Sequence, residues 1–161
     1  MREKNTAERG TFKREISTAL FNSAEIRELL CGDLSGKTIS EQREIFRKHV
    51  KSHLFIDDTV EDTDTFIFYD VRMPMLRTNT KSCNVILYAV CHRDILDGCN
   101  VDGYDGNRAD ILSQMVENCL LNDELTARSF GIGTLTLDSV DIYNSRRFYG
   151  VIMQFSVPNF R

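Results

Sequence analysis

A β-hairpin pattern runs through residues 133–157, GTLTLDSVDIYNSRRFYGVIMQFSV. In the second half of this stretch, every other side chain is apolar and falls on one face of a strand: Tyr149, Val151, Met153, Phe155 and Val157. In the first half, the apolar alternation reaches Leu137 and then shifts phase to Val140, which predicts a bulge near Asp138. The short linker, residues 144–147, predicts that the two strands pair antiparallel.

Two more β segments and a helix precede the hairpin. Residues 65–73 are rich in aromatic and β-branched side chains, and Pro74 ends the segment. Residues 83–94 are apolar on both faces at their centre, which predicts a central strand covered on both sides. Residues 108–121 repeat apolar side chains at helical spacing: Ile111, Leu112, Met115, Val116, Cys119 and Leu120. The order predicts a β-β-α-β-β unit whose four-stranded antiparallel sheet is covered by a helix.

Helical signals occupy the N-terminal third of the chain. The first helix is expected to start at Thr11 and to bury a stripe of one side chain per turn: Phe12, Ile16 and Leu20. Asn22 or Ser23 is the candidate N-cap of a second helix, which Gly32 or Gly36 ends. Thr38 opens a third helix, and Glu41 completes its capping box.

The fold class predicted from these elements is α+β, with N-terminal helices followed by the β-β-α-β-β unit. The expected organisation has two parts: a flexible N-terminal arm at residues 1–10 and a single domain at residues 11–161. Within that domain, residues 11–53 form the helical part and residues 65–160 form the sheet-and-helix part.

The charge balance is acidic, with a net charge of −4 and a pI of about 5.4. A protein that binds in a nucleic-acid groove normally carries a basic stripe, and none is evident here. An acidic protein can instead let DNA slide past, because repulsion of the phosphates prevents sticking. The polar N-terminus and the absence of an apolar run of about 18 residues predict a soluble intracellular protein.

Cysteine and histidine spacing suggests no metal site. Five cysteines without a CxxC pair are expected to be free thiols in a reducing compartment: Cys31, Cys83, Cys91, Cys99 and Cys119. His49 and His53 have the i, i+4 spacing of zinc ligands but no evident third ligand. The acidic loop with Asp102 and Asp105 fails the EF-hand pattern, and Asp105 or Asn107 is expected to cap the following helix.

Catalytic motifs are also missing. GIGTL at residues 131–135 lacks the GK[ST] of a phosphate-binding loop and leads into a strand. Cys91 and His92 are adjacent on a strand, so they point to opposite faces and cannot act as nucleophile and base. We therefore expect no catalytic residue, no cofactor and no metal, and we expect a structural protein rather than an enzyme.

Residues 66–160 resemble the tail-completion proteins of tailed bacteriophages, which comprise tail terminators and head–tail joining proteins. The likeness lies in a strand pair, a loop into the N-R-A-D-I-L helix at residues 107–112, and the final hairpin. This resemblance implies a hexameric ring in the virion, at the top of the tail tube, assembled in the host cytoplasm. The ring would cap the tube and receive the filled head. Its partners would be copies of itself, the tail-tube protein and a head-completion or connector protein, with DNA passing through without specific binding.

Ring assembly requires surfaces between copies, and the aromatic segment at residues 65–73 is a candidate for such a surface or for the core. Aromatic residues, Met and Arg are favoured in interfaces. The candidate interface residues are Phe66, Phe68, Tyr69, Arg72, Met73, Arg146 and Arg147. Two alternatives stay open: a small enzyme with a site near Asp70, His92 and Asp94, and a protein-binding adaptor that forms no ring.

Overall fold

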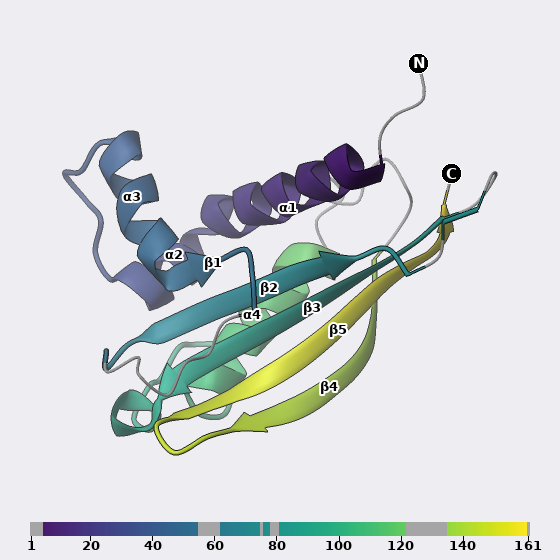
Figure 1. The fold of residues 1–161 in the computed structure, drawn as a ribbon. Helices are drawn as coiled ribbons and strands as arrows, with labels where there is room; N and C mark the ends of the chain where they lie inside the picture. The colour runs from purple at the N-terminus through teal and green to yellow at the C-terminus, as the bar shows by residue number, and fades with distance from the viewer. Residues whose placement is uncertain (1–4, 55–61, 75, 78–80, 122–134, 161) are drawn as a thin grey trace.

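A computed structural model describes residues 5–54, 62–74, 76–77, 81–121 and 135–160, and it confirms the α+β class (Figure 1). The helices are α1 (Asn5–Asn22), α2 (Ala24–Cys31), α3 (Ile39–His49) and α4 (Arg108–Leu121), with a short 3-10 turn, η1 (Arg93–Ile95). The strands are β1 (Val50–Lys51), β2 (Thr65–Arg72), β3 (Lys81–His92), β4 (Thr136–Asn144) and β5 (Phe148–Phe160).

The sheet has five strands in the order β1-β2-β3-β5-β4, and β1 runs parallel to β2 while the other pairs are antiparallel. The sequence predicted four antiparallel strands. The prediction lacks the short fifth strand, β1, which is parallel to its neighbour. The strand was missed because Val50 fits the apolar face of α3. The helix ends at His49 instead, and Val50 continues in extended backbone to pair with Ile67.

The C-terminal hairpin is confirmed in its order, its pairing and its irregularity. β4 pairs antiparallel with β5, and the register shifts between Leu137 and Ser139, which places the bulge at Asp138. Because of this shift, Val140 lies directly opposite Met153 and Ile142 lies directly opposite Val151. Directly paired residues share a sheet face, so these four side chains point the same way.

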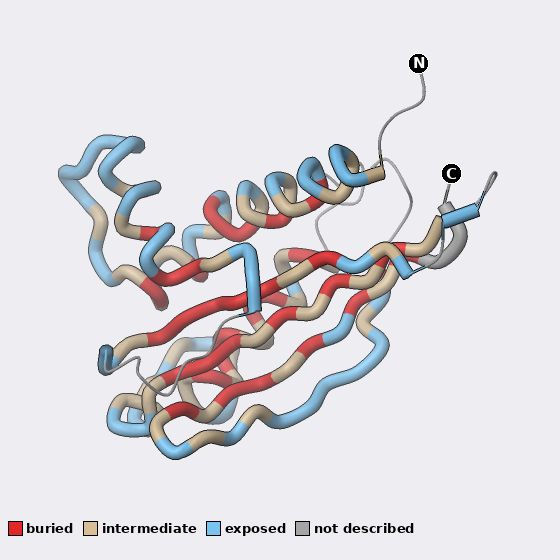
Figure 2. Tube along the Cα trace, viewed as in Figure 1, coloured by how far each residue is buried: buried red, intermediate tan, exposed pale blue. Residues whose placement is uncertain are grey.

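The core lies between the sheet and the helices α1 and α4 (Figures 1 and 2). Five of the six side chains on the predicted face of α4 are buried there, with Leu112 and Val116 fully enclosed, and the sixth, Cys119, is half-buried. The predicted stripe of α1 joins the same core, and Ile16 and Leu20 are likewise fully enclosed. The sheet is thus covered by two helices, where the sequence predicted one.

Strand β3 is central, as predicted, but its two faces differ in burial. The residues from Cys83 to Cys91 that face the helices are buried. On the other face, Ile86 and Tyr88 are only half-buried. The prediction of cover on both faces is therefore wrong for this part of the strand, because α1 and α4 both pack against the same side.

The helix α1 begins at Asn5 rather than at Thr11, so the expected flexible arm is helical from Asn5 to Gly10. The hydroxyl of Thr11 bonds to the carbonyl of Ala7 inside the helix and caps nothing. Polar contacts from this first part of α1 to the sheet, including the pair of Glu8 with Lys81, hold it against β2 and β3. Residues 1–4 lie outside the described residues.

The other helix boundaries follow their capping residues. The hydroxyl of Ser23 accepts the amide of Ile26 at the start of α2. The hydroxyl of Thr38 accepts the amide of Glu41 at 3.2 Å at the start of α3. Before α4, the side chain of Asn107 accepts the amide of Asp110 at 2.9 Å, while the Asp110 carboxylate accepts the amide of Asn107 at 3.0 Å. This reciprocal pair of bonds is a capping box, which identifies Asn107 as the cap.

Candidate assembly surfaces

Strand β4 forms one edge of the sheet and pairs, within the described residues, with β5 alone. Two of its apolar side chains are exposed, Val140 at 61% and Ile142 at 64%. Their direct partners on β5 are Met153, at 1%, and Val151, at 6%. Leu137, near the beginning of β4, packs against the core, whereas Figure 2 shows most of the strand exposed.

The same edge is acidic. Asp138, at the bulge, and Asp141 are both exposed. Asp138 accepts the hydroxyl of Thr136, and Asp141 accepts the amide of Ile142. Neither carboxylate forms an ion pair with another described residue, and β4 contains no Lys or Arg. The edge thus combines two exposed aliphatic side chains with two negative charges that no described cation pairs with.

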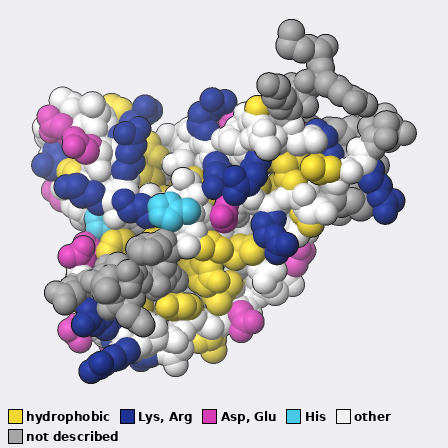
Figure 3. Space-filling model, viewed as in Figure 1, with side chains coloured by type: hydrophobic (Ala, Val, Ile, Leu, Met, Phe, Trp, Pro, Cys, Tyr) yellow, Lys and Arg dark blue, Asp and Glu magenta, His cyan; other side chains and the backbone are white. Residues whose placement is uncertain are grey.

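The opposite edge of the sheet, at α3 and β1, is basic. Arg47 and Lys48 are exposed at the end of α3, and Lys51 is half-exposed on β1. In the part of the chain that the structure describes, none of these three cations is engaged in an ion pair. Leu54, three residues after the end of β1, is exposed. Figure 3 shows Lys and Arg side chains gathered over this part of the molecule.

An aromatic cluster occupies one end of the sheet face that α1 and α4 leave free. Its buried members are Phe66, Phe68, Val90 and Phe148. The ring of Phe66 stacks on Phe68 at 5.8 Å and on His49 at 5.9 Å, and it meets Phe148 edge-on at 6.1 Å. Figure 3 shows further hydrophobic side chains on this face.

The structure separates the seven predicted interface residues into three places. Phe66, Phe68 and Tyr69 are buried within the chain and offer almost no surface to a neighbour. Exposed Arg72 and half-exposed Met73 lie where β2 ends, and Arg72 pairs in register with Asn84. A third place, the β4–β5 turn, holds exposed Arg146 and half-exposed Arg147.

The two arginine sites are at opposite ends of the sheet. The backbone carbonyl of Arg147 accepts the amide of Arg93, directly after β3 ends. Arg72 lies instead opposite the beginning of β3. The predicted residues therefore do not form one surface, whereas the exposed apolar pair Val140 and Ile142 was not selected from the sequence. Its signal was present in the phase slip after Leu137, which marks β4 as an irregular strand.

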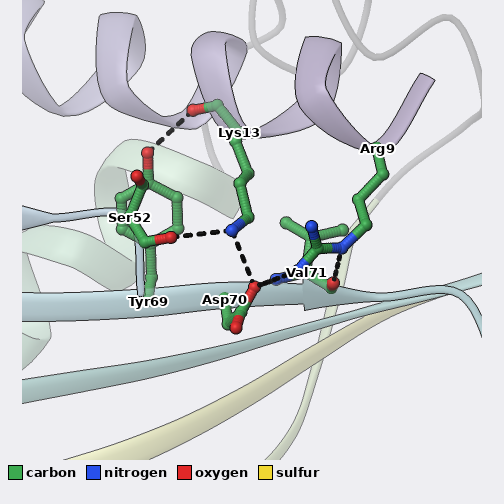
Figure 4. Close-up of polar contacts among 6 residues, drawn as sticks. All are labelled: Arg9, Lys13, Ser52, Tyr69, Asp70 and Val71. Carbon is green, nitrogen blue, oxygen red and sulfur yellow. Dashed lines mark hydrogen bonds and ion pairs between the residues drawn. The ribbon is translucent and has the colours of Figure 1, made fainter. Parts of the chain in front are cut away.

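Asp70 anchors α1 to the sheet (Figure 4). Its carboxylate pairs with Arg9 at 2.6 Å and with Lys13 at 2.9 Å. Arg9 also donates to the carbonyl of Val71 at 2.7 Å, and the hydroxyl of Tyr69 donates to the carbonyl of Lys13 at 2.8 Å. Partial burial alone would raise the pKa of Asp70, but hydrogen bonds from Lys13 and the Val71 amide, with both nearby cations, lower it overall. Asp70 therefore has a structural role as a charged acceptor.

The residues of the enzyme alternative are not brought together. Asp70 pairs in register with Ile86, whereas His92 lies six positions further along β3, which separates them by about 20 Å. Asp94 is near His92, and its amide donates to His92 Nδ1 at 3.1 Å to begin η1. A hollow of about 550 Å³ lies beside α2 and α4, but none of these three residues lines it. The proposed grouping of Asp70 with His92 and Asp94 is thus wrong.

The histidine pair lacks the geometry of a zinc site. His49 is the last residue of α3 and is buried, with Nδ1 3.0 Å from the carbonyl of Thr65. His53 is exposed beyond β1, so the two imidazoles do not share a helix face. No group of three potential metal ligands occurs within the described ranges. Residues 131–134 of the GIGTL segment lie outside those ranges.

All five cysteines are free thiols in the structure. Burial raises the pKa of Cys31 and of Cys83 to about 11. Burial also raises the pKa of Cys91, whose sulfur lies 3.5 Å from the Thr65 hydroxyl. These three thiols stay protonated at neutral pH, and a protonated thiol is a poor nucleophile.

Comparison with known proteins gives the chain a family. Residues 15–157 match the YomW family, a Bacillus phage-derived protein family. The match includes the C-terminal part of α1, all later helices and the sheet as far as residue 157 in β5, so it extends well beyond the second half of the chain. Among curated proteins, no match was found. None of the described helices has the length and hydropathy needed to cross a bilayer. The chain belongs to the YomW family and is a phage-related protein.

Proposed function

We propose that this chain is a structural protein of the phage neck, which forms a ring at the head–tail junction, caps the tail tube and lets DNA pass. The observation that carries this proposal is the uncovered part of β4, where Val140 and Ile142 are exposed on a face that is otherwise core. The phage origin of the family supports it. The order of strand pair, helix and hairpin, on which the resemblance to tail-completion proteins rests, supports it as well.

An uncovered apolar edge strand favours association between chains. Edge strands present unpaired amides and carbonyls, and natural proteins usually protect them with charges, bulges or cover. β4 has a bulge and two carboxylates, yet it exposes two large aliphatic side chains between and beside them. Fully burying such a side chain contributes about 1.5–3 kcal/mol. A contact that covers both would therefore be favourable in every copy of a ring.

The acidic balance suits passage of DNA. The chain has a net charge of −4, so each added copy makes a ring more negative. Negative walls repel phosphates, and DNA can then move through without being held. The partners in this proposal are further copies of the chain, the tail-tube protein and a head-completion or connector protein. The role is non-enzymatic, and the engagement of Asp70 in ion pairs that hold α1 supports it.

Deleting the gene from the phage tests the proposal. We expect DNA-filled heads and separate tails of abnormal length, because the capping ring would be missing. Supplying the unaltered chain should restore whole particles, whereas Val140→Asp should not. Thr18→Asp, which adds the same charge at an exposed position of α1, is the matched control and should restore them. Intact infectious particles in the deletion would overturn the proposal.

A further inference from the structure

We propose that the β4 edge of one copy binds the α3–β1 edge of a second copy. This inference rests on the proposed ring and identifies the two surfaces that would form it. On one side are Asp138 and Asp141 with Val140 and Ile142. On the other side are Arg47, Lys48 and Lys51 with Leu54.

The two edges are complementary in charge. Strand β4 contains two Asp and no basic residue. The segment formed by α3 and β1 contains four Lys and Arg against two Glu, a surplus of two positive charges. None of the four central side chains, Asp138, Asp141, Lys48 and Lys51, forms an ion pair with another described residue of its own chain. Complementary potentials of this kind fix the register of an interface and exclude wrong partners.

Each edge also offers apolar surface beside its charges. Val140 and Ile142 are exposed on β4, and Leu54 is exposed three residues after the end of β1. A contact between the edges would remove these side chains from water, which is the main favourable term in most associations. Because β1 has only two residues, it can form few backbone hydrogen bonds with another strand. Side-chain contacts would therefore stabilise most of this interface.

Pairing of β4 with β4 of another copy is the natural rival, and charge disfavours it. A two-fold contact would bring Asp138 and Asp141 of both copies into one interface, and four carboxylates would then repel one another. The basic edge removes this repulsion and replaces it with attraction.

The position of the two edges fits a ring. Strand order places β1 and β4 at opposite ends of the sheet. A contact between them is therefore heterologous, so each copy that joins uses one edge and leaves the other free, and an open assembly keeps one free edge of each kind. Heterologous contacts close into rings when the rotation between copies allows closure. One kind of interface is then sufficient for the whole ring.

Site-specific cross-linking tests the contact in the full chain. The photoreactive residue benzoylphenylalanine replaces Val140, and isotope-labelled and unlabelled chains are mixed, so that mass spectrometry identifies links between copies. We expect links to peptides from residues 43–54 of another copy. The same probe at Thr18, on the exposed side of α1, is the control and should give none. Links to β4 of another copy, or no link between copies, would overturn the inference.

Charge reversal adds an independent test. Asp138→Lys with Asp141→Lys should weaken self-association about tenfold or more, and Lys48→Glu with Lys51→Glu should do the same. Combining all four substitutions in one chain should restore association, and so should mixing the two variants, because opposite charges then face each other again. Circular dichroism verifies that each variant is folded. If the Lys48 and Lys51 reversal leaves association unchanged, the basic edge is not the partner.

These measurements separate the inference from the proposed function. The chain can associate through another surface and still complete the neck, in which case only the inference fails. It can also show the predicted cross-links while the gene deletion leaves particles intact, in which case only the neck function fails.

Discussion

Strands β4 and β5 carry similar aliphatic side chains on the same sheet face, yet their surroundings are opposite. Val151 and Met153 are buried beneath the helices, while their direct neighbours Val140 and Ile142 are exposed. On β4, Leu137 still packs against the core that α4 covers, whereas Val140 and Ile142 lie beyond that cover. Apolar side chains on a strand favour burial, but they are buried only where another element covers the strand. For the later part of β4 no such element occurs in the described part of the chain, and we propose that a second copy of the chain supplies it.

Val116→Asp should have the largest effect. Val116 is completely enclosed between α4 and the sheet, so a carboxylate there would be buried without a partner. We expect a loss of about 4 kcal/mol or more in the free energy of unfolding, measured by urea denaturation. A variant with unchanged melting behaviour would contradict the assigned core face of α4.

Val140→Asp is the matched control for this substitution. It introduces the same chemical change on the uncovered strand, and we expect the free energy of unfolding to stay within about 0.5 kcal/mol of the unaltered chain. Its effect should appear in self-association instead. If the two variants were equally destabilised, the distinction between the covered and uncovered strands would be lost.

Gly150→Ala should have the next largest effect, on the sheet face that α1 and α4 leave free. A Cβ at Gly150 would lie 2.5 Å from the carbonyl oxygen of Ala89 and 2.5 Å from a methyl group of Val90. We expect a loss of about 1–3 kcal/mol, because backbone would have to shift. Thermal unfolding measures it. No loss would mean that β3 and β5 are more loosely packed at the aromatic cluster.

Asp70→Asn should cost about 1 kcal/mol at neutral pH, because Arg9 and Lys13 lose their charged partner at a partly exposed site. The pKa of Asp70 is lowered in the folded chain, so its contribution is present above the ordinary pKa. It is lost as the pH falls from about 4 through the lowered folded-state value. The stability difference between the two chains should therefore shrink toward zero in acid. A difference that persists unchanged at low pH would exclude this ion-pair role.

Gly10→Ala should have the smallest effect, and it should be stabilising. Gly10 lies inside α1, and nothing lies within 4 Å of a Cβ built at this position. Replacing a helical Gly by Ala stabilises by about 0.5 kcal/mol. The polar sequence at residues 1–10 predicts a flexible arm instead, where the substitution would change stability little. An unchanged melting temperature would favour the arm over the helix.

Much of the fold could be predicted because its signals are local. The range of α4, the N-cap Thr38 and the bulge at Asp138 follow from periodicity, capping and a phase slip. The start of α1 and the strand β1 could not be predicted, because both depend on partners distant in sequence. The ion pair of Arg9 with Asp70 and the strand pairing of Val50 with Ile67 form only when the chain folds.

The candidate surfaces were harder to predict than the fold. Aromatic composition favoured Phe66 and Phe68 as interface residues, but they pack against Phe148 from the far end of the chain. Val140 has the pattern of a core residue, and only the three-dimensional reach of α4 reveals that it is exposed. Exposure depends on what covers a side chain, and a single strand pattern contains no information about cover.

A cryo-electron microscopy reconstruction of the neck of the phage particle tests the proposed role most directly. We expect a closed ring of this chain between portal and tail tube, with β4 of each copy against α3 and β1 of the next. A particle whose neck is complete without this chain would contradict the proposed role. A ring in which Val140 and Ile142 remain exposed to solvent would contradict the proposed contact.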